Sequence, residues 1–219
     1  MLVHQIFWDF KGKGRSIAQT SVIFDKCHRE TVEKVKEYGM EYKMWSYEDC
    51  ELLIKESYKQ YENLWNDFKV PMMKQDFIRN LILHKEGGIY IDLDIEPIKD
   101  FTELFEEKQF WVIWSNDKRK LPYNALRGSH KGNDLMIEIA NHSQESYYVK
   151  SQMPIYSKWK GRLVFQTTGH FAVNRVLKKH KIIGLDIINI NKNGKLIEGK
   201  NPYFTDYNAN LWDGEASVE

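Results

Sequence analysis

Residues 87–94 constrain the fold of this chain more than any other stretch. They read Gly87-Gly88-Ile89-Tyr90-Ile91-Asp92-Leu93-Asp94, which is a glycine pair, a short apolar run and two carboxylates one residue apart. The glycine pair predicts the end of a helix, and the apolar run predicts a strand that ends at the carboxylates. Side chains at positions i and i+2 of an extended backbone point the same way, so the sequence predicts that Asp92 and Asp94 grip one cation together.

The acidic pair suits a particular class of ligand. Hard divalent cations such as Mn²⁺ and Mg²⁺ prefer oxygen ligands, and they commonly bind one or two carboxylates together with substrate phosphates. The pair therefore predicts a site for Mn²⁺ or Mg²⁺ and a nucleoside diphosphate. The alternative is a strand that simply ends in solvated acidic residues.

Apolar segments of strand length alternate with longer amphipathic segments, which is typical of an α/β fold. Beside the strand that ends at Asp92, strands are predicted over residues 2–8 and 41–45, and residues 110–114 are predicted to form a buried central strand. One helix is predicted over residues 17–38. A capping box at Ser46 opens another, and Pro71 starts a third that runs to the glycine pair.

Composition narrows the classes of fold and partner. The 219 residues are 42% hydrophobic, enough for one good core. The formal net charge of +1 argues against nucleic acid or an anionic membrane as the partner. Two cysteines do not make a disulfide framework, and no apolar run reaches the roughly 20 residues of a membrane span. The N-terminus has no signal-peptide pattern, so the sequence predicts a soluble, cytoplasmic protein.

The predicted helix before the glycine pair carries a second polar group. Asp76 and Arg79 are three residues apart and therefore share one face of that helix. This helix ends just before the strand that carries Asp92 and Asp94, so its polar face can lie beside the acidic pair. The alternative is an exposed salt bridge within the helix, which would contribute little.

Four segments, taken in order, resemble a known family. They are Val3-His4-Gln5-Ile6-Phe7-Trp8, Glu41-Tyr42-Lys43-Met44-Trp45, Lys74-Gln75-Asp76-Phe77-Ile78-Arg79 and the stretch from Gly87 to Asp94. Their order resembles glycosyltransferase family 32, which carries a DXD sugar-binding region and is related to the large clostridial glucosylating toxins. Residues 2–100 hold most of the resemblance. It is weaker at Asn124-Ala125-Leu126, Thr167-Thr168-Gly169 and Asn210-Leu211-Trp212.

The resemblance implies a GT-A fold, which is a Rossmann-like, mixed, mostly parallel sheet flanked by helices. It also implies transfer of a sugar, with retention of configuration, from a nucleotide sugar to a carbohydrate or other hydroxyl acceptor, with Mn²⁺ or Mg²⁺. A UDP-hexose is the expected donor, and GDP-mannose stays open. We expect a single domain over residues 1–219, with a nucleotide-sugar half to about residue 100 and an acceptor half with a C-terminal lid after it. A bacterial or viral glycan pathway is the expected setting.

The resemblance also implies roles for the acidic residues and their neighbours. Asp94 is the expected direct metal ligand. Asp92 would reach the donor ribose and sugar, and the metal through water. Asp76 and Arg79 would hold the donor hydroxyls and the leaving phosphate, and Asn124 joins the donor-binding residues.

Two further parts of the donor site follow from the same resemblance. Phe7 or Trp8 would stack on the nucleotide base. At the C-terminus, Asn210 would ligate the cation and Trp212 would contact the diphosphate, which gives it a catalytic role. Residues 207–212 are expected to close over the donor as a lid.

Other functional classes remain open at this stage. A phosphatase of the haloacid dehalogenase type also uses an Asp-x-Asp strand end, but its motif does not continue as Glu96-Pro97. A non-catalytic sugar- or metal-binding module is the third possibility. Several aromatic residues could stack on an acceptor sugar or simply pack in the core: Tyr147, Tyr148, Tyr156, Trp159 and Tyr203.

Overall fold

The computed structural model describes residues 1–106, 110–114, 121–182, 185, 188–192, 195–198 and 202–209. The described helices are α1 (Ile17–Thr20), α2 (Val22–Glu37), α3 (Tyr47–Ser57), η1 (Lys59–Tyr61), α4 (Glu62–Asp67), α5 (Pro71–Glu86), α6 (Glu103–Glu106), α7 (Asp134–Lys150), α8 (Pro154–Lys158), α9 (Lys160–Thr167) and α10 (His170–Lys179). The described strands are β1 (Leu2–Ile6), β2 (Glu41–Trp45), β3 (Gly88–Ile91), β4 (Ile95–Pro97), β5 (Phe110–Trp114), β6 (Pro122–Ser129), β7 (Ile188–Lys192), β8 (Lys195–Ile197) and β9 (Phe204–Asp206).

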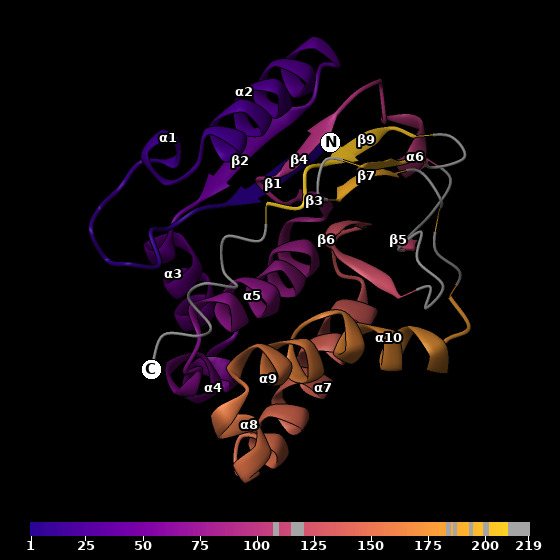
Figure 1. Cartoon of the computed structure of the whole chain (residues 1–219). Helices are drawn as coiled ribbons and strands as arrows, with labels where there is room; N and C mark the ends of the chain where they lie inside the picture. Colours follow the sequence, from indigo (N-terminus) through magenta and orange to yellow (C-terminus); the bar gives the residue numbers. More distant parts are fainter. Residues whose placement is uncertain are drawn as a thin grey trace.

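The central sheet has the strand order β2-β1-β3-β6-β5 (Figure 1). β1 pairs in parallel with β2 and β3, whereas β6 is antiparallel to both β3 and β5. Only β6 is reversed in this sheet, which confirms the predicted mixed, mostly parallel α/β architecture flanked by helices. Residues 110–114 are buried as predicted, with Trp111, Val112 and Ile113 at most 1% exposed, but β5 stands last in the strand order rather than at its centre, and beyond it Leu185 makes a single parallel bridge to Ile113.

A smaller sheet, with the order β4-β9-β7-β8, lies beside the central one (Figure 1). β4 follows β3 directly in the sequence, whereas its antiparallel partner β9 comes from the end of the described chain. Their register opposes Ile95 to Asp206. This pairing brings a C-terminal carboxylate next to the acidic pair that follows β3.

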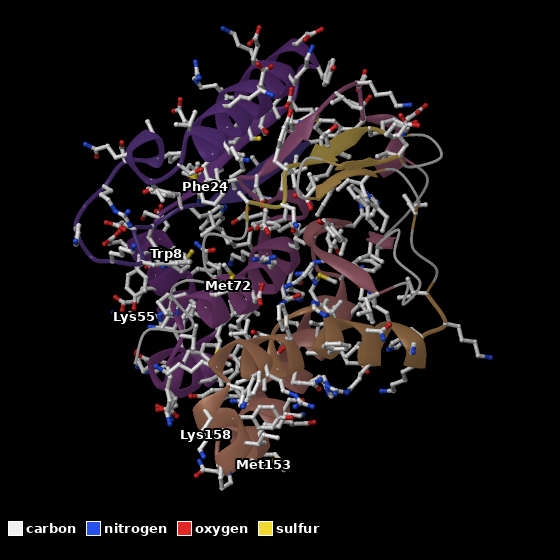
Figure 2. The ribbon with its side chains drawn as sticks, viewed as in Figure 1. Trp8, Phe24, Lys55, Met72, Met153 and Lys158 are labelled. Atoms are coloured by element: carbon white, nitrogen blue, oxygen red, sulfur yellow. The ribbon has the colours of Figure 1, made fainter. Side chains whose placement is uncertain are left out.

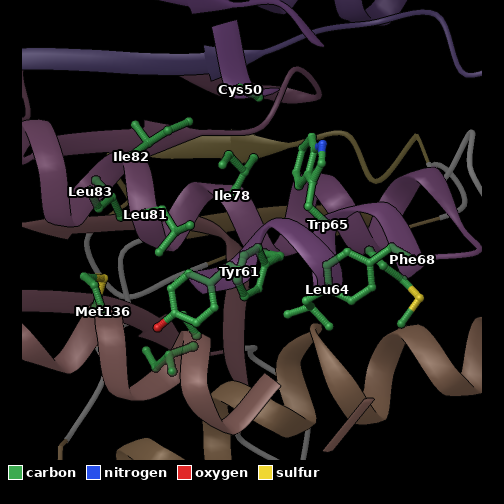
Figure 3. Close-up of a cluster of buried hydrophobic side chains, with 14 of the residues drawn as sticks. Cys50, Tyr61, Leu64, Trp65, Phe68, Ile78, Leu81, Ile82, Leu83 and Met136 are labelled. Carbon is green, nitrogen blue, oxygen red and sulfur yellow. The ribbon is translucent and has the colours of Figure 1, made fainter. Parts of the chain in front are cut away.

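Apolar side chains cover both faces of the central sheet. Successive residues of β3 point to opposite faces, since Tyr90 belongs to one buried cluster and Ile89 and Ile91 belong to the other. The larger cluster packs β3 against helices α3, α4, α5, α7, α9 and α10, while exposed side chains such as Lys55 project outward (Figure 2). Figure 3 shows the heart of this cluster, including Trp65 and Ile78.

The single helix predicted over residues 17–38 is wrong in one respect. Ser21 interrupts it with an extended backbone (φ −159°, ψ 131°) and separates α1 from α2. The Ser21 side chain accepts a hydrogen bond from the amide of Phe24, so Ser21 caps α2. Ser16 and Gln19 form a capping box on α1. A serine able to cap a new helix therefore outweighs the continuous apolar spacing.

The glycine pair joins α5 to β3 and fixes their relative position. Gly87 caps the C-terminus of α5 with φ 70°, and Gly88 starts β3 with φ 94°. A Cβ atom on Gly88 would lie 2.0 Å from the carbonyl oxygen of Leu2 on the neighbouring strand β1. Only glycine fits both the backbone angle and this approach. The junction holds the polar face of α5 against the end of β3.

Candidate active site

The candidate site lies at one edge of the central sheet. β1, β2 and β3 are parallel, so their carboxyl ends meet at the same edge, and Phe7, Ser46 and Asp92 follow those ends. In open α/β sheets this edge is the usual place for a ligand. The parallel pairing of these strands therefore brings two predicted site residues, Phe7 and Asp92, to the same edge of the sheet.

The acidic pair does not lie on an extended strand, which corrects the sequence prediction. The amide of Ile95 donates to the carbonyl of Asp92 at 3.1 Å and closes a turn between β3 and β4. Residues at i and i+2 of a turn do not share one face, so Asp92 and Asp94 meet different partners. Asp92 faces α5, and Asp94 faces the segment after β9.

Asp76 and Arg79 form a buried pair on α5. The side chains are 8% and 1% exposed, and Nη2 of Arg79 lies 3.1 Å from Oδ1 of Asp76. The alternative of an exposed surface salt bridge is therefore wrong. Nδ2 of Asn124 donates to Oδ1 of Asp76 at 2.6 Å, and Thr168 donates to its Oδ2 at 3.4 Å. Burial raises the pKa of Asp76 to about 6, although the Arg79 charge opposes the rise.

Arg79 connects this pair to the DXD motif. Its Nη2 lies 3.5 Å from Oδ1 of Asp92, and its guanidinium stacks 4.6 Å from the centre of the Tyr90 ring. Its other donors reach the carbonyls of Gln75 at 3.2 Å and Asn124 at 2.7 Å. The Tyr90 hydroxyl also donates to Asp92. Asp92 is 28% exposed, so it meets solvent while Arg79 and Asp76 behind it are buried.

Asp94 has a second carboxylate as its neighbour. The amides of Ala209 and Tyr207 donate to Oδ2 and to the carbonyl of Asp94 at 3.0 and 2.9 Å. Burial and repulsion by Asp92 raise the pKa of Asp94 to about 6, and burial and repulsion by Asp94 raise the pKa of Asp206 to about 8. Asp206 was not predicted from the sequence. It follows a three-residue strand and carries no local motif.

These neighbouring carboxylates suit a cation chemically. Each raises the cost of ionising the other, and a divalent cation between them would remove that cost. Among the described residues, however, no group of three His, Cys, Asp or Glu side chains is arranged to hold a metal. Asn210, the predicted amide ligand, and Trp212 lie outside the described residues. The described segment ends at Ala209, which is hydrogen-bonded to Asp94.

A pocket of about 640 Å³ opens beside Phe7 and Trp8 at the same edge of the sheet. Its size falls within the range of small-ligand sites, about 300–1,000 Å³. The Trp8 ring, partly buried, packs edge-on against Tyr47, with ring centres 5.6 Å apart. Nζ of Lys74 lies 3.0 Å from the Tyr47 hydroxyl, so the pocket combines aromatic walls with a cation.

The polar turn after β1 forms one rim of this pocket. Oδ2 of Asp9 accepts hydrogen bonds from the amides of Lys13 and Arg15 at 2.9 and 3.1 Å, and Asp9 pairs with the Arg15 guanidinium. That ion pair holds the pKa of Asp9 well below its usual range. The turn thus has a fixed centre at Asp9, and the Arg15 side chain is placed at the pocket.

Arg127, a second buried arginine near the site, was also not predicted from the sequence. Arg127 on β6 donates from Nη1 to Asn80 on α5 at 2.9 Å. In the part of the chain that the structure describes, its Nε and Nη2 have no hydrogen-bond partner. Burial and the nearby Arg79 charge lower its pKa to about 9. An arginine within a segment of strand length, Pro122–Ser129, was the available signal in the sequence.

The comparisons with known proteins cover the part of the chain that holds most of this site. A model of the family described as a glycosyltransferase sugar-binding region containing a DXD motif matches residues 19–111. That segment holds Asp76, Arg79 and the Asp92–Asp94 turn. No described helix has the length and apolar composition needed to span a membrane.

Two individual proteins are similar to this chain. The mannosyl phosphorylinositol ceramide synthase CSH1 of Saccharomyces cerevisiae is 38% identical over 144 residues, which cover 64% of this chain. The chain spans 35% of the length of that yeast protein. The solved structure of the PaToxG glycosyltransferase has a TM-score of 0.55 at 16% identity, covers 82% of this chain and is itself covered to 68%.

The likeness to PaToxG is one of fold, and the family match is to a glycosyltransferase region, so neither a haloacid dehalogenase-type phosphatase nor a non-catalytic module is needed to explain the site. Residues 19–111 of this chain match a glycosyltransferase sugar-binding region that contains a DXD motif.

Proposed function

We propose that this glycosyltransferase moves a hexose from a nucleoside diphosphate sugar to a hydroxyl acceptor, with retention of configuration and with Mn²⁺ or Mg²⁺. One observation carries the proposal: an aromatic pocket and the acidic turn lie at the same edge of the sheet, with a buried Asp76–Arg79 pair behind Asp92. The pocket suits a nucleotide base. The acidic turn suits the charged diphosphate with its cation.

Asp92 is the residue we assign to the donor sugar and ribose hydroxyls. It is the partly exposed end of a chain that runs through Arg79 to Asp76 and Asn124. Each guanidinium nitrogen of Arg79 already has an acceptor within the protein, so we assign Arg79 primarily to orienting Asp92. Arg79 also keeps a positive charge beneath the leaving phosphate, whose negative charge grows as the bond to the sugar breaks.

Asp94 and Asp206 are the carboxylates that we assign to the cation, with Asp92 acting through water. Asn210 is the proposed amide ligand from the C-terminal segment. When bound, the divalent ion supplies positive charge to the departing diphosphate. Trp212 remains the proposed indole donor to that group. We retain Phe7 and Trp8 as the rings for the base, since both line the pocket.

The donor nucleotide and the sugar are separate questions. The sequence resemblance favours UDP and a hexose, whereas the name of the yeast relative specifies a mannosyl group, which favours mannose. That name also places the sugar on a phosphorylinositol ceramide. A hydroxyl of a lipid headgroup is therefore a candidate acceptor here, beside a glycan hydroxyl.

The test is a panel of UDP-glucose, UDP-galactose, UDP-N-acetylglucosamine and GDP-mannose, each with Mn²⁺ or with a chelator. A donor present at 100 times its dissociation constant should stabilise the fold by about 2.7 kcal/mol. We expect one nucleotide to do so only with the metal, and its hydrolysis to follow the same pattern. The anomeric proton of the product, read by NMR, tests retention. Equal hydrolysis of a generic phosphate ester would contradict the proposal.

The division of the chain into two halves and a lid stays a proposal. Residues 1–100 would bind the donor, the later half would bind the acceptor, and residues 207–212 would act as the lid. Tyr207 is already anchored without a ligand, because its hydroxyl accepts from Lys26 at 2.7 Å. The truncation that tests the lid should therefore follow Ala209. It should keep a cooperative melt and lose most transfer, and a full-length tail cleaved equally fast with and without donor would contradict the lid.

A further inference from the structure

Large apolar side chains are exposed in one small region. Of the nine such side chains among the described residues, five fall within residues 148–159. They are Tyr148, Val149, Met153, Ile155 and Trp159, with exposures of 39, 60, 43, 49 and 65%. We call residues 148–160, the end of α7 with α8 and the start of α9, the α8 tip. Contiguous exposure of this kind marks an interaction surface.

The same part of the chain is strongly basic. Residues 146–185 contain no Asp or Glu and eight basic residues: Lys150, Lys158, Lys160, Arg162, Arg175, Lys178, Lys179 and Lys181. This segment carries +8 while the whole chain carries +1, so the remaining residues carry −7. The charges are close enough to act on one another, because burial and the Arg175 charge lower the pKa of Lys150.

Stability does not explain the most exposed ring. Trp159 occupies the N-cap position of α9, and among the described residues its side chain makes no capping hydrogen bond. Ser, Thr, Asp and Asn are the residues that stabilise this position. Lys158 and Lys160 flank the ring in the sequence. An exposed tryptophan between two lysines suits the boundary between lipid headgroups and acyl chains, where the ring buries its body and the lysines meet phosphate.

The α8 tip forms one end of the molecule (Figure 1), and Met153 and Lys158 project from it (Figure 2). α9 connects this tip to the active site, since Thr168 follows α9 directly and contacts Asp76. Eight helical residues span about 12 Å. A surface that held the tip would thus lie close to the proposed acceptor side.

We propose that the α8 tip docks this enzyme on the surface of a bilayer that contains anionic lipids. The tip is a convex, aromatic and cationic protrusion, which matches a lipid surface in both apolar character and charge. The near-zero net charge, which argued against membrane binding in the sequence, conceals a tip that carries three lysines, Lys150, Lys158 and Lys160, and no acidic residue.

The test is co-sedimentation of the whole chain with vesicles of phosphatidylcholine, with and without phosphatidylserine. The assay needs neither a nucleotide-sugar donor nor sugar transfer, so its result is independent of the proposed activity. We expect binding only with phosphatidylserine, and release by added salt because exposed charges are screened. The double variant Ile155→Ser, Trp159→Ser should bind at least about tenfold more weakly, since it loses two apolar anchors.

Matched variants separate the apolar and cationic contributions. Lys158→Gln and Lys160→Gln should each weaken binding about fivefold, which corresponds to about 1 kcal/mol. Leu52→Ser is the control, because Leu52 is 53% exposed but lies on α3, which carries four acidic residues and one lysine. It should bind vesicles like the wild type.

Three results would overturn the proposal. The first is wild-type protein that sediments equally little with both vesicles. The second is a tip variant that binds as tightly as the wild type. The third is a concentration-dependent dimer, seen by sedimentation velocity without lipid, that the double variant Ile155→Ser, Trp159→Ser abolishes while it binds vesicles like the wild type. That result would assign the tip to a second copy of the chain.

Discussion

The buried network at the DXD motif and the α8 tip use charged and aromatic side chains in opposite ways. In the network, Arg79 is 1% exposed and each of its nitrogens has a protein acceptor within 3.5 Å. At the tip, Trp159 is 65% exposed, and Lys158 also faces solvent. Charges that are buried and paired fix the position of a neighbouring group, whereas exposed ones remain available for a partner.

The difference also predicts where substitutions will be felt. A change in the network disturbs several buried polar groups, so it alters stability as well as activity. A change at Lys158 or Trp159, whose side chains are exposed, removes little buried contact, so it should alter binding and leave folding intact. The following experiments test that division.

Asp94→Asn should have the largest effect, on activity. If Asp94 ligates the cation as proposed, metal-dependent turnover should fall by roughly 100-fold or more. The fold should persist, because the substitution removes a buried charge that Asp92 and Asp206 repel. Glu33→Gln on the exposed face of α2 is the control, and both variants are compared by turnover and thermal melt. Full activity in Asp94→Asn would remove this residue from the proposed metal site.

Arg79→Met should have the largest effect on stability. It leaves Asp76 and Asp92 without their cation, and breaking a buried ion pair costs about 3–5 kcal/mol. Arg127→Met is the informative comparison, because it removes a buried cation that has a single described acceptor, Asn80. Its cost should be smaller, at about 1–3 kcal/mol for the amide left unpaired. Equal losses in urea unfolding would show that pairing does not separate the two arginines.

Particular residues show what the sequence could and could not predict. The helix that ends at Gly87 and the strand that follows it arise from local rules, and these rules were enough to place Asp76 and Arg79 beside Asp92. Asp206 could not be placed, because it reaches Asp94 only through the antiparallel pairing of β4 with β9.

The orientation of the acidic pair failed for a different reason. The spacing rule assumes that the strand continues, but the chain turns at Asp92 and starts β4 at Ile95. The burial of Asp76 also could not be predicted from the sequence of α5 alone. It depends on Asn124 from β6 and Thr168 after α9, which are 48 and 92 residues away in sequence.

Asp76→Asn should alter the pH dependence of stability. Burial raises the pKa of Asp76 to about 6 in the folded chain, above its ordinary value of 3.8. The folded state therefore holds this proton more tightly, and wild-type stability should fall as the pH rises from about 4 to about 6. Asparagine does not titrate. The stability of the variant relative to wild type should rise across this window by at most about 3 kcal/mol and stay level above it. Parallel curves for the two proteins in urea unfolding would contradict the shift.

Trp159→Ser should have the smallest effect on folding, and its sign is the sharpest test of the comparison. The ring is 65% exposed, so little packing is lost, and serine at the N-cap of α9 can accept the hydrogen bond that tryptophan cannot. We expect the free energy of unfolding to rise by about 0.5–1 kcal/mol, while vesicle binding falls. Leu52→Ser is the matched control, since it removes a side chain of 53% exposure from the interior of α3 and gains no cap. It should be neutral or slightly destabilising. A fall of more than about 1 kcal/mol in the free energy of unfolding of Trp159→Ser would mean that the ring holds α8 and α9 together. The tip would then be part of the structural core at its most exposed residue, and the contrast with the buried network would fail.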